Sequence, residues 1–480
     1  MQIDNTVTVE EAVQALALVG DLSMGQPTDG SIRAARLAGR LAQADGAGST
    51  ACAHARLVAL LRWSGCTANA SGFAALLGDD VGGRDAMLTH TLPPHNPLTV
   101  TSVAPLARIH CEVSGDIAGL LGLPAEVEAG LRHVWEHFDG NGLPDRLQGA
   151  AIPVVVFYAS LGGDLDILAR THGTDEALRM IGRMAERKYP ARLVRLLDAH
   201  ARAWLDELDT VPGDADADAD APLLARRVPL TIVADMIELK LPWLTGYSRR
   251  VAELAQDAGA RLGLVSTQLH CLGRAALIHG IGRAAVPNTV WERDGRLGAA
   301  DWEKIRLVPY WTARAGAQIP ALRAEAALAS HAYERQDASG YFRSLDAGAL
   351  NLPQRLLAAA CAYAALCMPR PWRPAHAPDA AARLLGEQAA HGAFDAAAVD
   401  AVIAAAGGTA LAAHGRKALL SEREAEVLRR ISLGESNKEA ARVMGISPST
   451  VRTHVESIFR KLACSTRAAA TLKALTLGLI

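Results

Sequence analysis

The sequence predicts an all-α protein, and three observations support this prediction. Half of the 480 residues are hydrophobic, but aromatic residues make up only 4% of the chain. Apolar residues recur at helical spacing through most of the sequence, as in VAELAQDAGARLGLV. Alternating apolar and polar runs, which are typical of strands, are scarce. A chain of this length is expected to form about three domains.

Two stretches interrupt the helical pattern and predict the domain boundaries. Residues 209–223 include the acidic repeat VPGDADADADAP, which is too poor in apolar groups to offset its ordering entropy. Residues 405–418 are glycine-containing and become basic toward their end. Taking both as linkers gives helical domains at 1–208 and 224–404 and a C-terminal domain at 419–480. The first two domains share the order of their motifs and resemble a distant internal repeat.

Bulk properties favour a cytoplasmic protein. The net charge is −2, so a nucleic-acid-binding surface has to be local. Seven cysteines occur without a C-x-x-C pair, which argues against a disulfide framework or a zinc site. The N-terminus lacks the basic and apolar segments of a secretion signal, and no apolar run is long enough to span a bilayer as a helix. We therefore expect no membrane association.

The C-terminal domain carries signals for four short helices. S-x-x-E capping boxes at Ser421 and Ser436 predict the first two helix starts, and Ser447 followed by Pro448 predicts the third. Gly445 supplies a tight turn between the second and third helices, which is typical of a helix-turn-helix. A fourth helix is expected over residues 466–477.

The third helix of this domain has one apolar and one polar face. Val451, Val455, Ile458 and Leu462 recur at spacings of four, three and four. The opposite face carries hydroxyls near its start and cations further along, which suits a helix in the DNA major groove. Between residues 416 and 473, twelve Lys and Arg stand against six Asp and Glu. The alternative is a small helical bundle whose charges are only solvated.

The run SNKEAARVMGISPSTVRTHVESIFRKL resembles the LuxR-type helix-turn-helix family over nearly its full length. The resemblance implies a transcriptional regulator that binds double-stranded promoter DNA, with the fourth helix as a dimer contact. Glu456 departs from the cationic or neutral residue common in the family, so it either accepts a hydrogen bond from cytosine or rejects some sequences. The expected DNA-binding residues are Asn437, Lys438, Ser447, Ser449, Thr450, Arg452, Thr453, Glu456, Ser457, Arg460 and Lys461.

The second helical domain resembles the HD-GYP family of metal-dependent phosphodiesterases, which hydrolyse cyclic di-GMP. The similar segments, in order, are GYSRRVAELAQDAGARLGL, ALIHGIGRAAVPN, GRLGAADWEKIRLVP, SHAYERQDASGY and RPWRPA. His279 matches a metal ligand of that family. The other expected ligand positions and the lysine position hold Tyr247, Gly280, Arg283, Val308, Ala332, Tyr333 and Cys361. A single imidazole cannot hold a metal pair.

The first helical domain resembles a more diverged copy of the same family. His110 is kept within RIHCEVSGDIAGLLGL, and the loop residues Asp139, Gly140, Gly142 and Pro144 match well. Other positions of the pattern hold Arg62, Trp63, Val134, Trp135, Leu143 and Gly163. Histidines such as His133, His137 and His331 are more often structural than metal ligands, so we expect neither a metal nor another cofactor.

These resemblances together predict a DNA-binding regulator, not an enzyme, whose two HD-like domains have lost catalysis. Two roles remain open for those domains: a retained small-molecule pocket that senses an effector, or a helical scaffold for homodimerisation. The alternative function is a residual metal-dependent phosphohydrolase or cyclic-dinucleotide phosphodiesterase fused to a DNA-binding domain. Operator sequence and the direction of regulation are not encoded in any motif.

Overall fold

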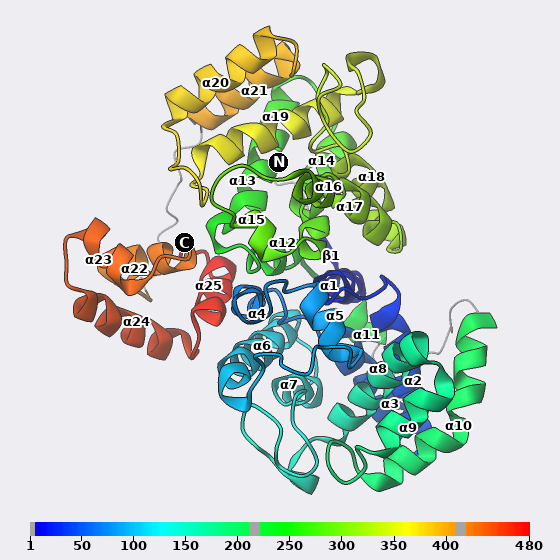
Figure 1. Ribbon diagram of the computed structural model, residues 1–480. Coiled ribbons are helices and arrows are strands. Elements are labelled where there is room, and N and C mark those ends of the chain that lie inside the picture. Colours follow the sequence, from blue (N-terminus) through cyan, green and yellow to red (C-terminus); the bar gives the residue numbers. More distant parts are fainter. Residues whose placement is uncertain (1–4, 211–220, 409–418) are drawn as a thin grey trace. The chain divides into compact units, whose positions relative to one another are not determined.

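The computed structural model describes residues 5–210, 221–408 and 419–480 and confirms the all-α prediction (Figure 1). Within these ranges the only named strands are β1 (Thr6–Thr8) and β2 (Arg227–Pro229), which form one two-stranded sheet. The chain divides into two compact units. One is Thr8–Val228, and the other is Pro229–Ile480 together with the residues before Thr8. No helix in the described ranges is long and apolar enough to cross a bilayer.

The unit Thr8–Val228 is built from helices that bury alanine-rich faces. Its helix α2 packs against α3 and α8, and α6 packs against α7. At Gly162 an added Cβ would lie 2.7 Å from the carbonyl oxygen of Ala34, so α8 approaches α2 closely because this position lacks a side chain. The helices are α1 (Val9–Ser23), α2 (Gly30–Ala44), α3 (Ser49–Leu61), α4 (Ala70–Leu77), α5 (Gly82–Leu88), α6 (Val100–Leu121), α7 (Ala125–Arg132), η1 (Gly149–Ala151), α8 (Val154–His172), α9 (Thr174–Gly182), α10 (Ala191–Thr210) and α11 (Ala221–Leu224).

The other unit begins with a second helical array, in which α13 packs against α14, α19 and α21. The apolar face of α13 supplies Val251, Leu254 and Ala258 to this core. The helices are α12 (Thr231–Glu238), η2 (Pro242–Leu244), α13 (Tyr247–Arg261), α14 (Ser266–Ile278), η3 (Ile281–Ala285), α15 (Asn288–Trp291), α16 (Ala299–Arg306), α17 (Val308–Gly316), η4 (Pro320–Leu322), α18 (Arg323–Ala329), η5 (Ala347–Ala349), α19 (Leu352–Cys367), α20 (Pro378–Ala390) and α21 (Ala396–Gly408).

The C-terminal part of this unit forms the four predicted helices: α22 (Glu422–Ser432), α23 (Asn437–Met444), α24 (Pro448–Leu462) and α25 (Arg467–Thr476). Val451, Val455, Ile458 and Leu462 of α24 are buried, as their spacing predicts. They share one hydrophobic cluster with residues of α22, α23 and α25.

The predicted linkers fall mostly outside the described residues. Of the stretch 209–223, residues 211–220 are not described, α10 runs to Thr210 and α11 begins at Ala221. Of the stretch 405–418, residues 409–418 are not described, and α21 continues to Gly408. The exact domain boundaries therefore stay a prediction.

Candidate DNA-binding surface and ligand cavity

The helix starts of the C-terminal domain are fixed by side-chain caps. The Ser421 hydroxyl accepts the Glu424 backbone N–H at 3.2 Å, and the Glu424 carboxylate accepts the Ser421 backbone N–H at 2.7 Å. Ser436 and Glu439 repeat this reciprocal pair at 3.3 and 2.8 Å. Each cap contributes about 1 kcal/mol. Both predicted capping boxes are confirmed.

The turn before α24 uses a left-handed backbone. Gly445 ends α23 with a φ of 66°, a conformation that strains residues with a Cβ. Ser447 then accepts the Thr450 backbone N–H at 3.0 Å, and Pro448 takes the first helical position. This short connection sets α24 as the second helix of a helix-turn-helix.

The outward face of α24 presents polar side chains to solvent. The Arg452 and Glu456 side chains are 76% and 64% exposed and form an ion pair with Nε and Oε1 3.0 Å apart. Exposed pairs one helical turn apart contribute only a few tenths of a kcal/mol, so DNA could readily replace this partner. Thr453 donates to the Ser449 carbonyl at 3.2 Å. Among the predicted DNA-binding residues, the exposed ones are Lys438, Ser447, Ser449, Thr450, Arg452, Thr453, Glu456, Arg460 and Lys461.

Two predicted DNA-binding residues on α24 also bind a buried carboxylate. Ser457 Oγ donates to Glu424 Oε1 at 2.7 Å, and Lys461 Nζ donates to Oε2 at 2.6 Å. Burial acts to raise the pKa of Glu424, but the hydrogen bonds from Lys461, Ser421 and Ser457 lower it to about 2. This carboxylate thus ties α24 to the start of α22 at neutral pH. The half-buried Asn437 accepts from Arg467 Nη2 at 2.6 Å.

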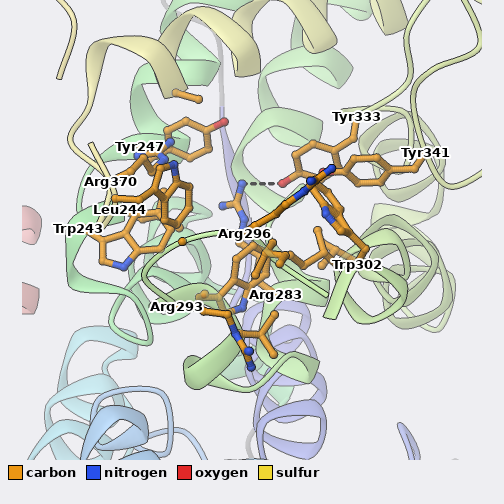
Figure 2. A pocket seen from close by; sticks show the side chains of 18 residues that line it. Trp243, Leu244, Tyr247, Arg283, Arg293, Arg296, Trp302, Tyr333, Tyr341 and Arg370 are labelled. Carbon is orange, nitrogen blue, oxygen red and sulfur yellow. Dashed lines mark hydrogen bonds between the residues drawn. The ribbon is translucent and has the colours of Figure 1, made fainter. Parts of the chain in front are cut away.

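The helical array before this domain contains a cavity of about 820 Å³ (Figure 2). Its lining is rich in aromatic and arginine side chains. The residues that carry its chemistry are Trp243, Tyr247, Arg283, Trp291, Arg293, Arg296, Trp302, Tyr333, Tyr341, Arg370 and Trp372. No Asp or Glu lines it. Such a surface can stack flat rings and attract anions.

The positions that correspond to family metal ligands meet at the inner wall of this cavity. The rings of Tyr247 and His279 lie 5.5 Å apart, and those of His279 and Tyr333 lie 6.3 Å apart. Arg283 Nη2 donates to the Tyr333 hydroxyl at 2.6 Å, as drawn in Figure 2. Tyr247 donates to the Cys361 carbonyl at 2.9 Å. The structure therefore brings these positions together.

Two buried glutamates hold the segments that carry these side chains. Glu238 accepts the backbone N–H of Gly246 and Ser248, at 2.7 and 2.6 Å, which fixes the start of α13 and thus Tyr247. Burial, reinforced by nearby Asp235, raises the pKa of Glu238 to about 7. Glu334 accepts the N–H of Arg343 and Leu345, at 2.8 and 3.1 Å, and fixes the loop that carries Tyr341.

The side chains gathered here do not fit the metal centre that the resemblance implies. His279 Nε2 is 3.1 Å from Arg283 Nη2, so this lone pair already has a partner. Burial raises the pKa of the Cys361 thiol to about 12, which keeps it protonated at neutral pH. Across residues 5–210, 221–408 and 419–480, no three His, Cys, Asp or Glu side chains are grouped to hold a metal ion.

The corresponding positions of the other unit form a closed cluster. Trp135 stacks on His110 with ring centroids 5.0 Å apart, and Trp63 packs edge-on at 6.5 Å. Cys66 Sγ lies 3.5 Å from His110 Nδ1. Burial, with a smaller effect of Arg84, lowers the pKa of His110 to about 3, so this imidazole is neutral.

Sequence reasoning missed most of the cavity wall. Of the eight tryptophans, Trp243, Trp291, Trp302 and Trp372 line this one cavity. Arg293, Arg296 and Arg370 were not singled out either. The signal that could have found them is this clustering of tryptophan and arginine within about 130 residues of a chain that is poor in aromatics.

Comparisons with known proteins support both family resemblances, the HD-type one and the LuxR-type one. Residues 231–398 match the HD domain family, and residues 418–474 match the LuxR family of bacterial regulatory proteins. A 3'3'-cGAMP-specific phosphodiesterase 3 from Vibrio cholerae is 26% identical over 300 residues, which are 60% of this chain and 65% of that protein. This similarity overturns the prediction that the protein is not an enzyme, because it points toward phosphodiesterase activity.

A solved structure supports the fold over a longer span. The crystal structure of a cyclic GMP-AMP-specific phosphodiesterase from V. cholerae superposes with a TM-score of 0.58 and 20% identity, covering 84% of this chain and 99% of that one. At this identity the likeness shows the fold alone.

The C-terminal domain has its own relatives. A probable transcriptional regulatory protein NarL of Mycobacterium tuberculosis is 47% identical over 57 residues, which are 12% of this chain and 26% of that protein. The chain thus covers less than two thirds of either curated relative's length. These matches identify the protein as a fusion of an HD phosphodiesterase-like domain with a C-terminal LuxR-type helix-turn-helix domain.

Proposed function

We propose that this protein is a DNA-binding transcriptional regulator whose HD domain binds a small-molecule effector in the cavity. The observation that carries the proposal is the exposed polar face of α24 within a domain that matches the LuxR family. Regulators of that family bind promoter DNA. The cavity beside His279 supplies a concave, largely aromatic site of the size that small ligands occupy.

In this proposal the start of α24 enters the major groove. Arg452 and Thr453 contact base edges, and Glu456 either accepts from a cytosine amino group or excludes some sequences. Lys438, Arg460 and the hydroxyls of Ser447, Ser449 and Thr450 hold phosphates, as does half-buried Asn437. Ser457 and Lys461 combine phosphate contact with their bonds to Glu424.

Footprinting of the full-length protein on its own promoter region tests the DNA-binding function. We expect saturable, salt-sensitive protection, because phosphate contacts release counterions. Replacing both Arg452 and Thr453 by alanine should weaken specific binding by about 2–4 kcal/mol, from the loss of one bidentate and one weaker base contact. Arg423→Ala on α22 is the matched control. Unchanged promoter occupancy in the double variant would remove the regulator proposal.

Homodimerisation is part of the same proposal, with α25 as the contact once it separates from α12, against which it packs in this structure. LuxR-type domains are expected to bind two half-sites, and a symmetric dimer matches such a site. Sedimentation equilibrium of the full chain, alone and with promoter DNA, gives the stoichiometry. One protein chain per DNA duplex at saturation would contradict this part.

A second candidate function is hydrolysis of a cyclic dinucleotide, favoured by the similarity to the 3'3'-cGAMP-specific phosphodiesterase. Incubating the purified protein with 3'3'-cGAMP, with and without Mn²⁺, and separating the products by chromatography tests it. Linear product that accumulates in proportion to protein concentration supports hydrolysis. Intact nucleotide under both conditions, together with measurable binding, leaves effector sensing as the role of the cavity.

A further inference from the structure

The guanidinium of Arg283 lies at the centre of the HD-domain site, which is the group formed by Tyr247, His279 and Tyr333. Arg283 lies on η3, is only 5% exposed, and lines the cavity between Tyr247 and Tyr333 (Figure 2). Its Nη2 donates to the Tyr333 hydroxyl at 2.6 Å and lies 3.1 Å from His279 Nε2. Its central carbon lies 5.0 Å from the ring centroid of Tyr247.

The hydrogen bond from Arg283 occupies the His279 nitrogen lone pair that would otherwise bind a metal. His279 Nδ1 is 2.6 Å from the Ala276 carbonyl, which can only accept, so Nδ1 carries the proton. Nε2 is then the acceptor for the Arg283 N–H. Burial, strengthened by the Arg283 charge, lowers the pKa of His279 to about 3, so the ring stays neutral.

No carboxylate contacts Arg283 directly, although the buried Glu238 acts on its charge from a distance. No ion pair to Arg283 occurs within the described residues, and its buried Nη1 has no hydrogen-bond partner there. Arg296 and Arg370 also line the cavity, as does Arg293, which pairs with Asp301 at 3.3 Å. Burial, together with the nearby Arg283 charge, lowers the pKa of Arg370 to about 10. Buried cations without a directly paired carboxylate are costly, so an anion in the cavity would be favoured.

The rest of the wall offers flat surfaces beside this charge. Tyr333 and Tyr341 are stacked with centroids 5.1 Å apart, and the guanidinium of Arg370 lies 5.0 Å from the Trp243 ring centroid. The indole N–H groups of Trp243 and Trp291 are buried without a partner in the described chain. A ligand that joins an anionic group to flat rings would satisfy the charge and use these surfaces.

We propose that Arg283 acts as the resident cation of this site, holding the phosphate of a phosphodiester-linked nucleotide without a divalent metal. The guanidinium bonded to His279 stands where the resemblance implies metal ions. Arg370 supplies a second cation, and the tryptophans and tyrosines stack the bases. This inference rests on the proposed effector-binding function and adds its chemistry: charge-assisted hydrogen bonds in place of metal coordination.

Isothermal titration of the full-length protein with 3'3'-cGAMP and with cyclic di-GMP tests the proposal. Each titration is run in EDTA and again with excess Mn²⁺. We expect at least one of the two nucleotides to bind, with a Kd that changes less than threefold between the two conditions. Binding that strengthens tenfold or more with Mn²⁺, or no binding of either nucleotide in any condition, would overturn the proposal.

Arg283 variants test whether the guanidinium itself binds the nucleotide. Arg283→Gln should weaken nucleotide binding by about 10- to 100-fold, because a charge-assisted pair is lost. Arg283→Lys should recover only part of it, since an ammonium cannot bridge His279 and Tyr333 and also bind phosphate. Arg261→Gln, at the exposed end of α13, is the control and should bind like the wild type. Wild-type affinity in Arg283→Gln would contradict the assignment.

The two proposals fail in different ways. Loss of promoter binding in the footprint with intact nucleotide binding removes the regulator function but not the cation role of Arg283. Intact promoter binding with metal-dependent nucleotide binding removes only the cation role. Nitrogen-15 NMR of the histidine rings adds a readout independent of affinity: the His279 Nε2 signal should shift on Arg283→Gln and stay unchanged on adding Mn²⁺.

Discussion

The regions around His110 and His279 share a buried scaffold but differ in what fills its centre. Glu136 accepts backbone N–H groups nine and eleven residues further on, at 2.7 and 3.0 Å. Glu334 does the same at the same offsets, at 2.8 and 3.1 Å. Each glutamate therefore fixes an equivalent loop by the same two charge-assisted hydrogen bonds.

A second buried carboxylate is repeated in the same way. Asp21 accepts the backbone N–H of Ser31 at 3.0 Å, and Glu238 accepts that of Ser248 at 2.6 Å, ten residues on in both cases. Burial raises the pKa of Asp21 to about 6 and that of Glu238 to about 7. Matching contacts at matching offsets support the internal repeat that the order of motifs indicates.

The centres of the two regions have diverged. Around His110, Trp135 stacks on the imidazole and Cys66 contacts it. Around His279, Arg283 and Tyr333 form a polar cluster that opens into the cavity. The difference teaches that the carboxylates position the loops whatever side chains those loops carry, so the centre can change while the fold persists.

The largest expected effect tests the shared scaffold. Glu136→Ala and Glu334→Ala should each destabilise their own unit by about 3–5 kcal/mol, because two backbone N–H groups lose a charged, buried acceptor. Hydrogen–deuterium exchange of peptides from each unit, read by mass spectrometry, measures the loss locally. Glu→Gln at each position, which keeps an acceptor, should cost less. A loss in one unit but not in the other would break the proposed equivalence.

Substitutions of two glycines test whether both regions need the same close approach of one backbone segment to another. A Cβ at Gly65 would overlap the carbonyl oxygen of His110, and a Cβ at Gly282 would overlap that of Val308. Alanine at either position should destabilise its unit by about 3 kcal/mol, since backbone cannot move aside cheaply. Urea unfolding compared with Gly386→Ala, where no atom lies within 4 Å, checks this. An equal midpoint for Gly282→Ala and the control would contradict it.

A pH series compares the two histidines. The pKa of each lies at about 3 when folded, against 6.5 ordinarily. A lowered pKa means that the unfolded chain takes up the proton first, so stability falls as pH drops from 6.5 toward 3, by about 1.4 kcal/mol per pH unit for each histidine. His110→Gln and His279→Gln should each reduce the slope of unfolding free energy against pH by about one proton. An unchanged slope in either variant would show that the histidine ring is already protonated in the folded protein.

The smallest effects are expected when the aromatic residues Tyr333 and Trp135, one from each region, are exchanged in type. Tyr333→Trp should reduce nucleotide binding with a stability change of only about 1 kcal/mol, because the larger ring extends into a cavity and the Arg283 hydrogen bond is lost. Trp135→Tyr should destabilise its unit by about 1–2 kcal/mol, because packing on His110 is lost. Calorimetric titration and urea unfolding measure the two outcomes. Tighter nucleotide binding in Tyr333→Trp would contradict the role given to the cavity.

Much of this molecule follows from the sequence alone. Apolar spacing and capping boxes give the helices of the C-terminal domain, because a cap and an amphipathic face are local properties. Ser421, Ser436, Ser447 and Gly445 hold the positions in the structure that their sequence context predicts. The family resemblances likewise follow from the order of motifs.

Only the tertiary structure decided what the HD-domain site contains. The sequence marks Arg283 as a substituted lysine and His279 as a retained ligand, but it cannot show that one donates to the other. It also cannot show that Trp243, Trp302 and Trp372 line one cavity, since they come from separate segments. Local patterns set helices because their interactions lie within one turn, whereas the charge, shape and free hydrogen-bonding groups of a cavity depend on packing between distant segments.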